Sequence, residues 1–152
     1  MAKVLERPSD LYEQDFVAWI EQQLDHLRAG RFEELDLPNL IRELEEMGRS
    51  QRRELKSRLE VLLMHLLKRD HAKRRSRSWN STIIEQRARI ADLLTDSQSL
   101  RRELERLVGT AWPVAVARAS AETGLARDRF PQTLPYSLDA ILQEGSNEIG
   151  AG

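Results

Sequence analysis

The stretch LPNLIRELEEMGRSQRRELKSRLEVLLMHLLKRD, residues 37 to 70, determines the fold that this sequence predicts. Its helical seam advances by about 3.6 residues per step, which is the period of a nearly straight α-helix. At about 1.5 Å per residue, one helix of this length spans about 50 Å. Gly48 costs about 1 kcal/mol in a helix interior, but we expect the helix to continue through it. The seam follows Leu37, Ile41, Leu44, Gly48, Gln51, Leu55, Leu59, Leu62 and Leu66.

Upstream of this long helix, the pattern predicts a first helix that begins at Ser9 or Asp10 and ends at Gly30. A short connection then leads to Asp36, which is expected to cap the long helix, with Pro38 in its first turn. Apolar residues of the first helix recur at spacings of three and four, and we expect this stripe to be core. Its members are Tyr12, Phe16, Trp19, Ile20, Leu24 and Leu27.

Downstream, Ser78 is positioned to cap a third helix over residues 79–94, which would form a helical hairpin with the long helix. Asp96 or Ser97 then opens a fourth helix that Gly124 ends. Within that fourth helix, Pro113 is expected to introduce a kink or a division, because it removes a ladder hydrogen bond.

The predicted fold class is all-α: a bundle of four main helices around one very long second helix, followed by a short C-terminal helix over residues 137–143. No segment shows the alternation typical of a strand. The expected organisation is an N-terminal extension over residues 1–9, a single all-helical domain over 10–144 and a disordered tail over 145–152.

Composition excludes several classes of function. The chain of 152 residues has no cysteine, which excludes disulfides, thiolate metal sites and cysteine nucleophiles. No apolar run approaches the length of a membrane span, and the start resembles no signal peptide, so we expect a cytoplasmic protein without membrane contact. The formal charge is only −1, but acids gather over residues 33–46 and bases over residues 68–77.

Several segments together resemble domain-of-unknown-function family 29, a bacterial family that is abundant in cyanobacteria. The similarity covers about residues 11 to 142, and it implies an all-helical fold and a bacterial origin. Because the family has no established activity, the resemblance implies no function. The segments that carry it are Tyr12 to Phe16 with Trp19, Leu27 to Phe32, Glu43 to Ser50, Leu62 to Lys68, Arg74 to Trp79, Glu122 to Leu125, Phe130-Pro131 and Pro135-Tyr136.

The sharpest candidate site is the basic turn that precedes Trp79. Its guanidinium groups have the chemistry to hold phosphates, and the indole has the chemistry to stack on a base of a single strand. The alternative, which we favour, is a solvated turn whose charges complement the negative end of the long helix, with Trp79 as a core anchor. The binding candidates are Arg69, Lys73, Arg74, Arg75, Arg77 and Trp79, next to Lys68.

Arg58 and His65 are weak catalytic candidates. They lie seven residues apart on one face, a spacing similar to that of helical-bundle ribonucleases of the HEPN kind, in which such a pair acts on the scissile phosphate. The favoured alternative is a core histidine that hydrogen-bonds within the fold. No paired Glu and His with the spacing of a bundle metal site is present, so neither a metal nor another cofactor is expected.

Three hypotheses therefore stand. The first is a non-enzymatic helical interaction module that contacts an unknown protein partner. The second is binding of RNA or single-stranded DNA through the basic turn, and the third is a ribonuclease that uses Arg58 and His65. A homodimer is expected from the charge pattern, with two long helices antiparallel and an apolar centre near Leu55 or Leu59. The alternative is a monomer that covers its own seam.

Overall fold

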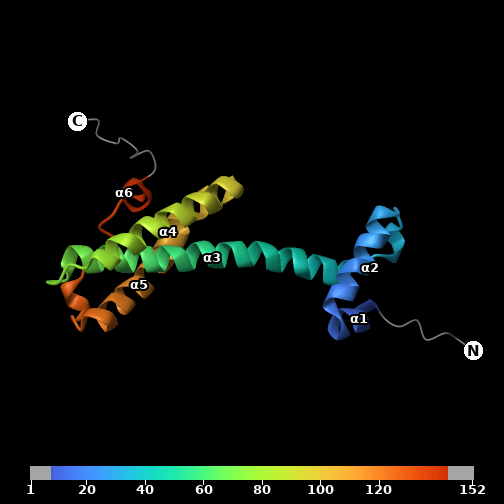
Figure 1. The fold of residues 1–152 in the computed structure, drawn as a ribbon, viewed down its shortest axis with the longest axis horizontal. Coiled ribbons are helices and arrows are strands. Elements are labelled where there is room, and N and C mark those ends of the chain that lie inside the picture. The colour runs from blue at the N-terminus through green and yellow to red at the C-terminus, as the bar shows by residue number, and fades with distance from the viewer. Residues whose placement is uncertain (1–7, 144–152) are drawn as a thin grey trace, which may run out of the picture. The chain divides into compact units, whose positions relative to one another are not determined.

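The structure is a computed structural model that describes residues 8–143. These residues form six α-helices and three short 3-10 helices, with no strand among them, so the all-α prediction is confirmed (Figure 1). The tail predicted over residues 145–152, and most of the extension predicted over residues 1–9, lie outside the described residues. The elements are α1 (Pro8–Gln14), α2 (Phe16–Arg28), η1 (Phe32–Glu34), α3 (Leu37–His71), α4 (Arg77–Asp96), η2 (Gln98–Glu103), α5 (Leu104–Thr123), η3 (Arg127–Arg129) and α6 (Leu138–Leu142).

The chain divides into two compact units, Met1–Ser50 and Gln51–Gly152, which we call unit 1 and unit 2. Helix α3 contributes its first residues to unit 1 and its remaining residues to unit 2. The single domain expected over residues 10–144 stays a prediction.

Helix α3 is continuous over 35 residues, and Gly48 does not interrupt it. At its start, the Asp36 carboxylate accepts from the backbone N–H of Asn39 at 3.5 Å, as the sequence predicted for an N-cap. Lys68, Arg69 and His71 lie in its last turn, where positive charge complements the helix dipole.

The predicted first helix is divided at Asp15. This residue has extended backbone angles, φ −148° and ψ 90°, and its carboxylate accepts from the backbone N–H of Ala18 at 3.0 Å. An aspartate that caps a new helix stops the preceding one, so two helices form where one was expected. Helix α2 ends before Gly30, which adopts φ 70° and therefore has the left-handed conformation that glycine tolerates best.

Two boundaries in unit 2 also differ from expectation. Helix α4 begins at Arg77, because Ser76 rather than Ser78 is the cap and accepts from the Ser78 backbone N–H. The expected fourth helix opens with the 3-10 segment η2 before α5 begins.

Pro113 does not divide α5, which runs without a break from Leu104 to Thr123. The carbonyl that loses its partner belongs to Gly109, and both residues are exposed, so water can hydrate that carbonyl. The helix ends at Gly124, which has φ 73° as expected for a helix C-terminus.

Unit 2 is built around the C-terminal half of α3, which α4 and α5 flank (Figure 1). Leucines on several sides of α3 are fully buried, so this half of the helix is surrounded as predicted. Arg87 of α4 secures α6 by donating to the carbonyls of Ala140 and Ile141 at 3.0 and 2.8 Å. The buried residues are Leu55, Leu59, Leu62, Leu63, Met64, Leu66 and Leu67 of α3, Ile83, Ile90 and Leu94 of α4, Leu100 of η2, Leu104, Leu107, Val108, Ala111, Trp112, Ala115 and Ala119 of α5, with Phe130 and Ile141.

The expected core stripe of the first helix is not a core. Trp19 is 2% exposed, but the other large members on α2 are between 37% and 43% exposed. Phe16 contacts the rings of Tyr12 and Trp19, whereas Ile20 and Leu24 face outward, so the stripe predicted from the spacing is not one buried face. The exposed members are Phe16, Ile20, Leu24 and Leu27.

Truncation of Leu62 to alanine is expected to destabilise unit 2 by about 2–5 kcal/mol, because it leaves a cavity in a tightly packed core. Chemical denaturation monitored by circular dichroism measures the change. Ile84→Ala is the matched control, since Ile84 lies on α4 of the same unit and is 69% exposed. Equal losses in the two variants would contradict the assignment of this core.

Candidate functional site

The interior of unit 1 is polar. Asp36 is buried, and its carboxylate accepts from the indole N–H of Trp19 at 3.0 Å and from the amide of Asn39 at 2.8 Å. The Asp36 backbone N–H donates to the side-chain oxygen of Gln23 at 2.7 Å. Three side chains of α2 and α3 therefore converge on one capping residue, whose buried carboxylate and backbone N–H are hydrogen-bonded.

The same face of α3 continues to Glu43, which accepts a hydrogen bond from the Tyr12 hydroxyl. This bond raises the pKa of Tyr12. Tyr12 also meets the rings of Phe16 and Trp19 with centroid distances of 5.7 and 5.0 Å. Polar and aromatic contacts thus fix how α1 and α2 lie against the start of α3.

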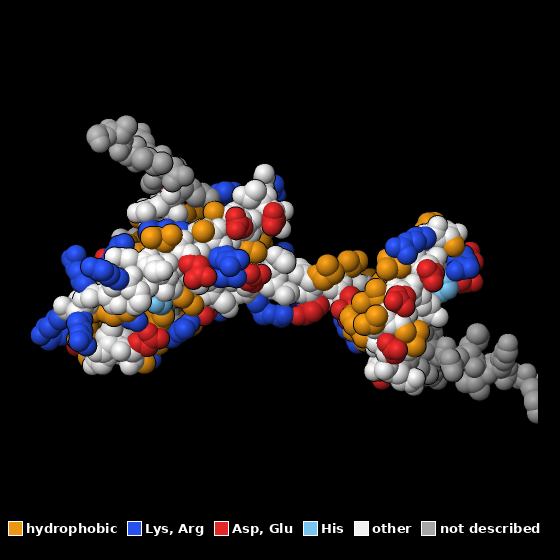
Figure 2. All heavy atoms as spheres, viewed as in Figure 1, with side chains coloured by type: hydrophobic (Ala, Val, Ile, Leu, Met, Phe, Trp, Pro, Cys, Tyr) orange, Lys and Arg blue, Asp and Glu red, His pale blue; other side chains and the backbone are white. Residues whose placement is uncertain are grey.

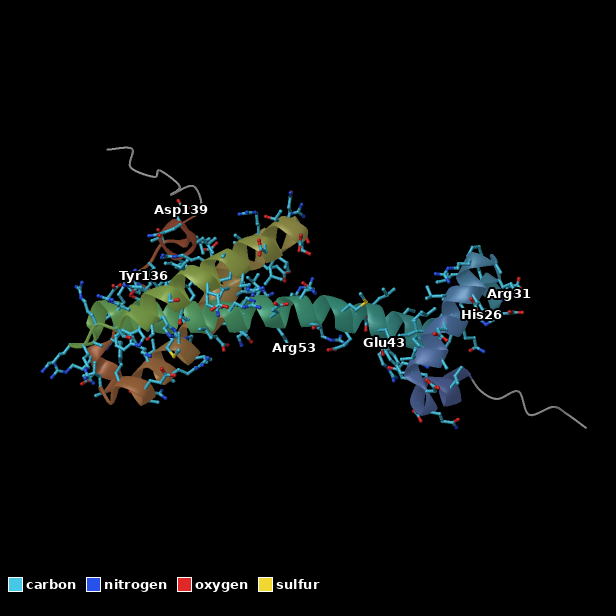
Figure 3. The ribbon with its side chains drawn as sticks, in the orientation of Figure 1. His26, Arg31, Glu43, Arg53, Tyr136 and Asp139 are labelled. Atoms are coloured by element: carbon cyan, nitrogen blue, oxygen red, sulfur yellow. The ribbon has the colours of Figure 1, made fainter. Side chains whose placement is uncertain are left out.

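At the other end of α2, the connection to α3 is held by Glu34. Its carboxylate lies 3.0 Å from His26 Nδ1 and 3.3 Å from Arg31 Nε, and Figure 3 shows both residues at this end of the unit. Polar side chains therefore contribute to holding this connection.

The outer faces of the same helices are apolar. Ten of the twelve large hydrophobic residues that are exposed within residues 8–143 lie in unit 1. Eight of them form two stripes with helical spacing, and Figure 2 shows hydrophobic side chains gathered over α2 and the first half of α3. We call these eight residues the apolar surface: Val17, Ile20, Leu24 and Leu27 on α2, with Leu37, Ile41, Leu44 and Met47 on α3.

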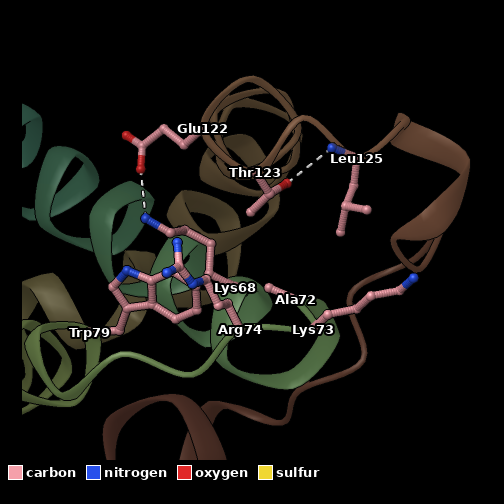
Figure 4. A pocket seen from close by; sticks show the side chains of 8 residues that line it. All are labelled: Lys68, Ala72, Lys73, Arg74, Trp79, Glu122, Thr123 and Leu125. Carbon is pink, nitrogen blue, oxygen red and sulfur yellow. Dashed lines mark hydrogen bonds and ion pairs between the residues drawn. The ribbon is translucent and has the colours of Figure 1, made fainter.

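The basic turn of unit 2 borders a pocket of about 650 Å³ between the end of α3, the start of α4 and the end of α5 (Figure 4). Lys68 is buried in it, with its ammonium 2.7 Å from the Glu122 carboxylate and 4.7 Å from the centroid of Trp79. The hydrogen bond from Lys68 lowers the pKa of Glu122 despite partial burial. Lys68 is therefore an internal tie, while Lys73 and Arg74 are exposed on the pocket's rim.

Of the other predicted members of the basic turn, Arg69 and Arg75 line a small second pocket with Trp79, whereas Arg77 does not. Arg69 binds the Asp70 carboxylate at 2.8 Å, and the Tyr136 hydroxyl donates to the same carboxylate at 2.7 Å. Burial raises the pKa of Asp70, but these hydrogen bonds outweigh it and hold that pKa below its usual range. Arg77 is the exposed first residue of α4.

Arg58 and His65 each form hydrogen bonds within the protein. Arg58 donates to Glu54 on the same helix at 3.0 Å and to Gln86 of α4 at 3.4 Å. His65 is half-buried, and its Nδ1 donates to the carbonyl of Val61 at 2.8 Å. Neither side chain lines the pocket at the basic turn.

Sequence reasoning missed the polar centre of unit 1. Asp36 was expected as a cap, but its links to Trp19 and Gln23 join residues 17 and 13 positions apart. One signal was present, since Gln23 interrupts the inward side of an otherwise apolar helical stripe. Within residues 8–143, no helix is long and apolar enough to cross a membrane, and no cluster of histidine and acidic side chains is arranged to hold a metal ion.

Over residues 8–143, the fold is all-helical and presents a buried polar centre, an exposed apolar surface and a basic pocket. The chain belongs to the family described as Domain of unknown function DUF29, whose model matches residues 11–145. This match confirms the family resemblance. No curated protein and no solved structure shows significant similarity to the chain.

Acid is expected to weaken unit 2 through Asp70 and Glu122. Both carboxyls have a lowered pKa in the folded state, so their stabilisation is present above the unfolded pKa and is lost as the pH falls through the folded value. The melting temperature of an Asp70→Asn/Glu122→Gln variant should therefore fall less than that of the wild type between pH 7 and about pH 3. A Glu85→Gln/Asp92→Asn variant controls for the loss of two charges. If the melting temperature of the Asp70→Asn/Glu122→Gln variant fell as much as that of the wild type, these two contacts would contribute nothing to the acid response.

Replacing Arg74, Arg75 and Arg77 together with alanine is expected to change the free energy of unfolding by no more than about 0.5 kcal/mol. All three side chains are exposed, and no ion pair within residues 8–143 joins them to an acid. Chemical denaturation tests this expectation. A large loss of stability would identify the arginines as structural ties.

Proposed function

We propose that this protein is a non-enzymatic interaction module that docks another protein chain on the apolar surface of unit 1. The observation that carries the proposal is the inverted burial of that unit. Gln23, Asp36 and Asn39 are buried, whereas Leu44 and Met47 are 66% and 64% exposed.

Exposed apolar patches of this extent support a docking function on physical grounds. On an ordinary monomer, the largest contiguous apolar patch covers about 300–600 Å² and is often functional. The eight residues of the apolar surface, each between 37% and 66% exposed, lie on two helices and expose a summed area on the order of 800 Å². Keeping this area in water is unfavourable, and burying it against another chain supplies the driving force for association.

The stripes also have the spacing that helical partners use. On α2, Val17, Ile20 and Leu24 follow each other by three and four residues, and on α3 the stripe advances by four and then three. Such rows form the ridges that pack into the grooves of a neighbouring helix. The proposed partner surface is therefore helical and apolar.

Comparative capture tests the docking proposal. Wild-type protein, an Ile41→Gln/Leu44→Gln variant and an Ile84→Gln control are each cross-linked in a lysate of the organism that makes the chain. We expect cross-linked species, including any that contain a second copy, to be lost in the double variant and retained in the control. Glutamine preserves helix propensity and adds no charge. Recovery of the same cross-linked species with all three proteins would contradict a role for the apolar surface.

A second candidate function is binding of RNA or single-stranded DNA at the basic turn. The observation that favours it is the half-buried Trp79 in a pocket whose rim carries Lys73 and Arg74. An indole face beside exposed cations has the chemistry to stack a base and to hold its phosphate. The Lys68 ammonium lies over the Trp79 ring and pairs with Glu122. Both contacts reduce the positive charge and the ring surface available to a ligand. For this reason we place it second.

Fluorescence anisotropy with labelled single strands tests this second candidate. The Arg74→Ala/Arg75→Ala/Arg77→Ala variant should bind more weakly, with a salt slope reduced by about three, or about one unit per lost phosphate contact. An Arg89→Ala/Arg102→Ala/Arg127→Ala variant removes the same charge from exposed positions elsewhere and should keep the wild-type slope. Absence of binding by the wild type at low salt would end this candidate.

A further inference from the structure

We propose that the apolar surface of unit 1 is buried against the same surface of a second copy of this chain, in a two-fold symmetric homodimer. This inference rests on the docking function proposed above and names its occupant. It follows from the composition of unit 1, the area of the surface, the geometry of the stripes and the charges around them.

Unit 1 has almost no apolar interior of its own. Among its described residues, Trp19 is the only large hydrophobic side chain that is buried. Units this small gain little from burial within one chain, and they commonly depend on disulfides, metals or association for stability. Disulfides are excluded because the chain has no cysteine. Association would give unit 1 an apolar core that it lacks alone.

The area matches what a stable dimer requires. Protein interfaces of standard size bury about 800 Å² on each partner, which is the order of area that the eight stripe residues expose. A two-fold axis places the same patch on both sides, so each apolar residue meets an apolar neighbour. No other described surface offers this match, because unit 2 exposes only Ile84 and Val114 among its large hydrophobic side chains.

The polar centre orients the two stripes for such a contact. At about 100° per residue, Asp36, Asn39 and Glu43 share one face of α3, and the centre of the apolar stripe lies about a third of a turn away. On α2, Trp19 and Gln23 similarly point inward while Ile20 and Leu24 face outward. Two such helix pairs, packed by their stripes, form an intermolecular helical bundle.

The position of this interface differs from the one expected from the sequence. An antiparallel dimer centred near Leu55 or Leu59 is excluded, because both side chains are fully buried within their own chain. The exposed part of the α3 seam lies instead at Leu37, Ile41 and Leu44.

Charge around the surface determines how the dimer responds to salt. Residues 11–50 contain ten acidic and four basic side chains, a net charge of −6. Two copies of unit 1 therefore repel each other electrostatically while their apolar surfaces attract. Salt screens the repulsion between exposed charges, so the dimer becomes tighter as ionic strength rises.

Sedimentation of the purified full chain at about 1–100 μM, in about 50 mM and about 500 mM salt, tests the proposal. We expect a dimer whose dissociation constant falls several-fold at the higher salt. The Ile41→Gln/Leu44→Gln variant should raise the dissociation constant at least about tenfold, and Ile84→Gln should leave it unchanged. Circular dichroism confirms that each variant retains its helix content.

Thiol protection provides a second measurement that does not depend on weakening the dimer. Because the wild type has no cysteine, Leu44→Cys introduces a single reporter, and Ile84→Cys provides its control. Maleimide labelling at position 44 should slow as protein concentration rises, while labelling at position 84 stays constant.

Three results would overturn the inference: one chain mass at every concentration and salt, a dimer that both Ile41→Gln/Leu44→Gln and Ile84→Gln leave intact, or a Leu44→Cys thiol that stays equally reactive in the dimer. The first of these, combined with capture that the double variant abolishes, would overturn the second copy as occupant and leave the docking function standing. If sedimentation showed one chain mass throughout and capture recovered the same species with every variant, both proposals would be overturned.

Discussion

Unit 2 depends on the burial of the C-terminal half of α3. From Leu55 to Leu67, leucines on several sides of this helix are removed from water, and α4, α5 and α6 contribute buried residues to the same core. A helix that is apolar on several sides requires several neighbours, which explains why three further helices assemble around it. The buried Lys68 tolerates this environment because it is paired with Glu122 and lies over the ring of Trp79.

In unit 1, the same helix makes mainly polar contacts. There the residues that hydrogen-bond to α1 and α2 are polar, and Leu37, Ile41, Leu44 and Met47 are exposed. Hydrogen bonds to Asp36 have strict geometry, so they determine the rotation of α2 on α3 more narrowly than apolar contacts would. One continuous helix thus contributes both to a unit with a complete apolar core and to a unit whose large apolar residues are mostly exposed.

Helical period, caps and stop signals predicted most elements of the fold. Asp36, Gly124 and the continuity of α3 through Gly48 were all evident from local patterns. The break at Asp15 and the exposure of the α2 stripe were not, because periodicity shows which residues share a face but not whether another element covers it. The basic turn could be identified because its residues are consecutive, although the sequence did not distinguish the internal tie Lys68 from the exposed arginines. The polar centre around Asp36 joins residues from two helices, and no local pattern predicts such a pairing.

The shortage of apolar interior in unit 1 also affects its motions. Where few apolar side chains are buried, a segment opens by local unfolding at a much lower free energy than the global transition. Backbone amides of α2 will therefore exchange with deuterated water through brief openings of unit 1, whereas amides near Leu62 and Leu63 will exchange only when unit 2 unfolds. A chain seated on α2 and α3 would suppress those openings. Ordering of unit 1 and recognition of its partner would then be linked steps of a single equilibrium, and affinity would include the free energy of closing the unit.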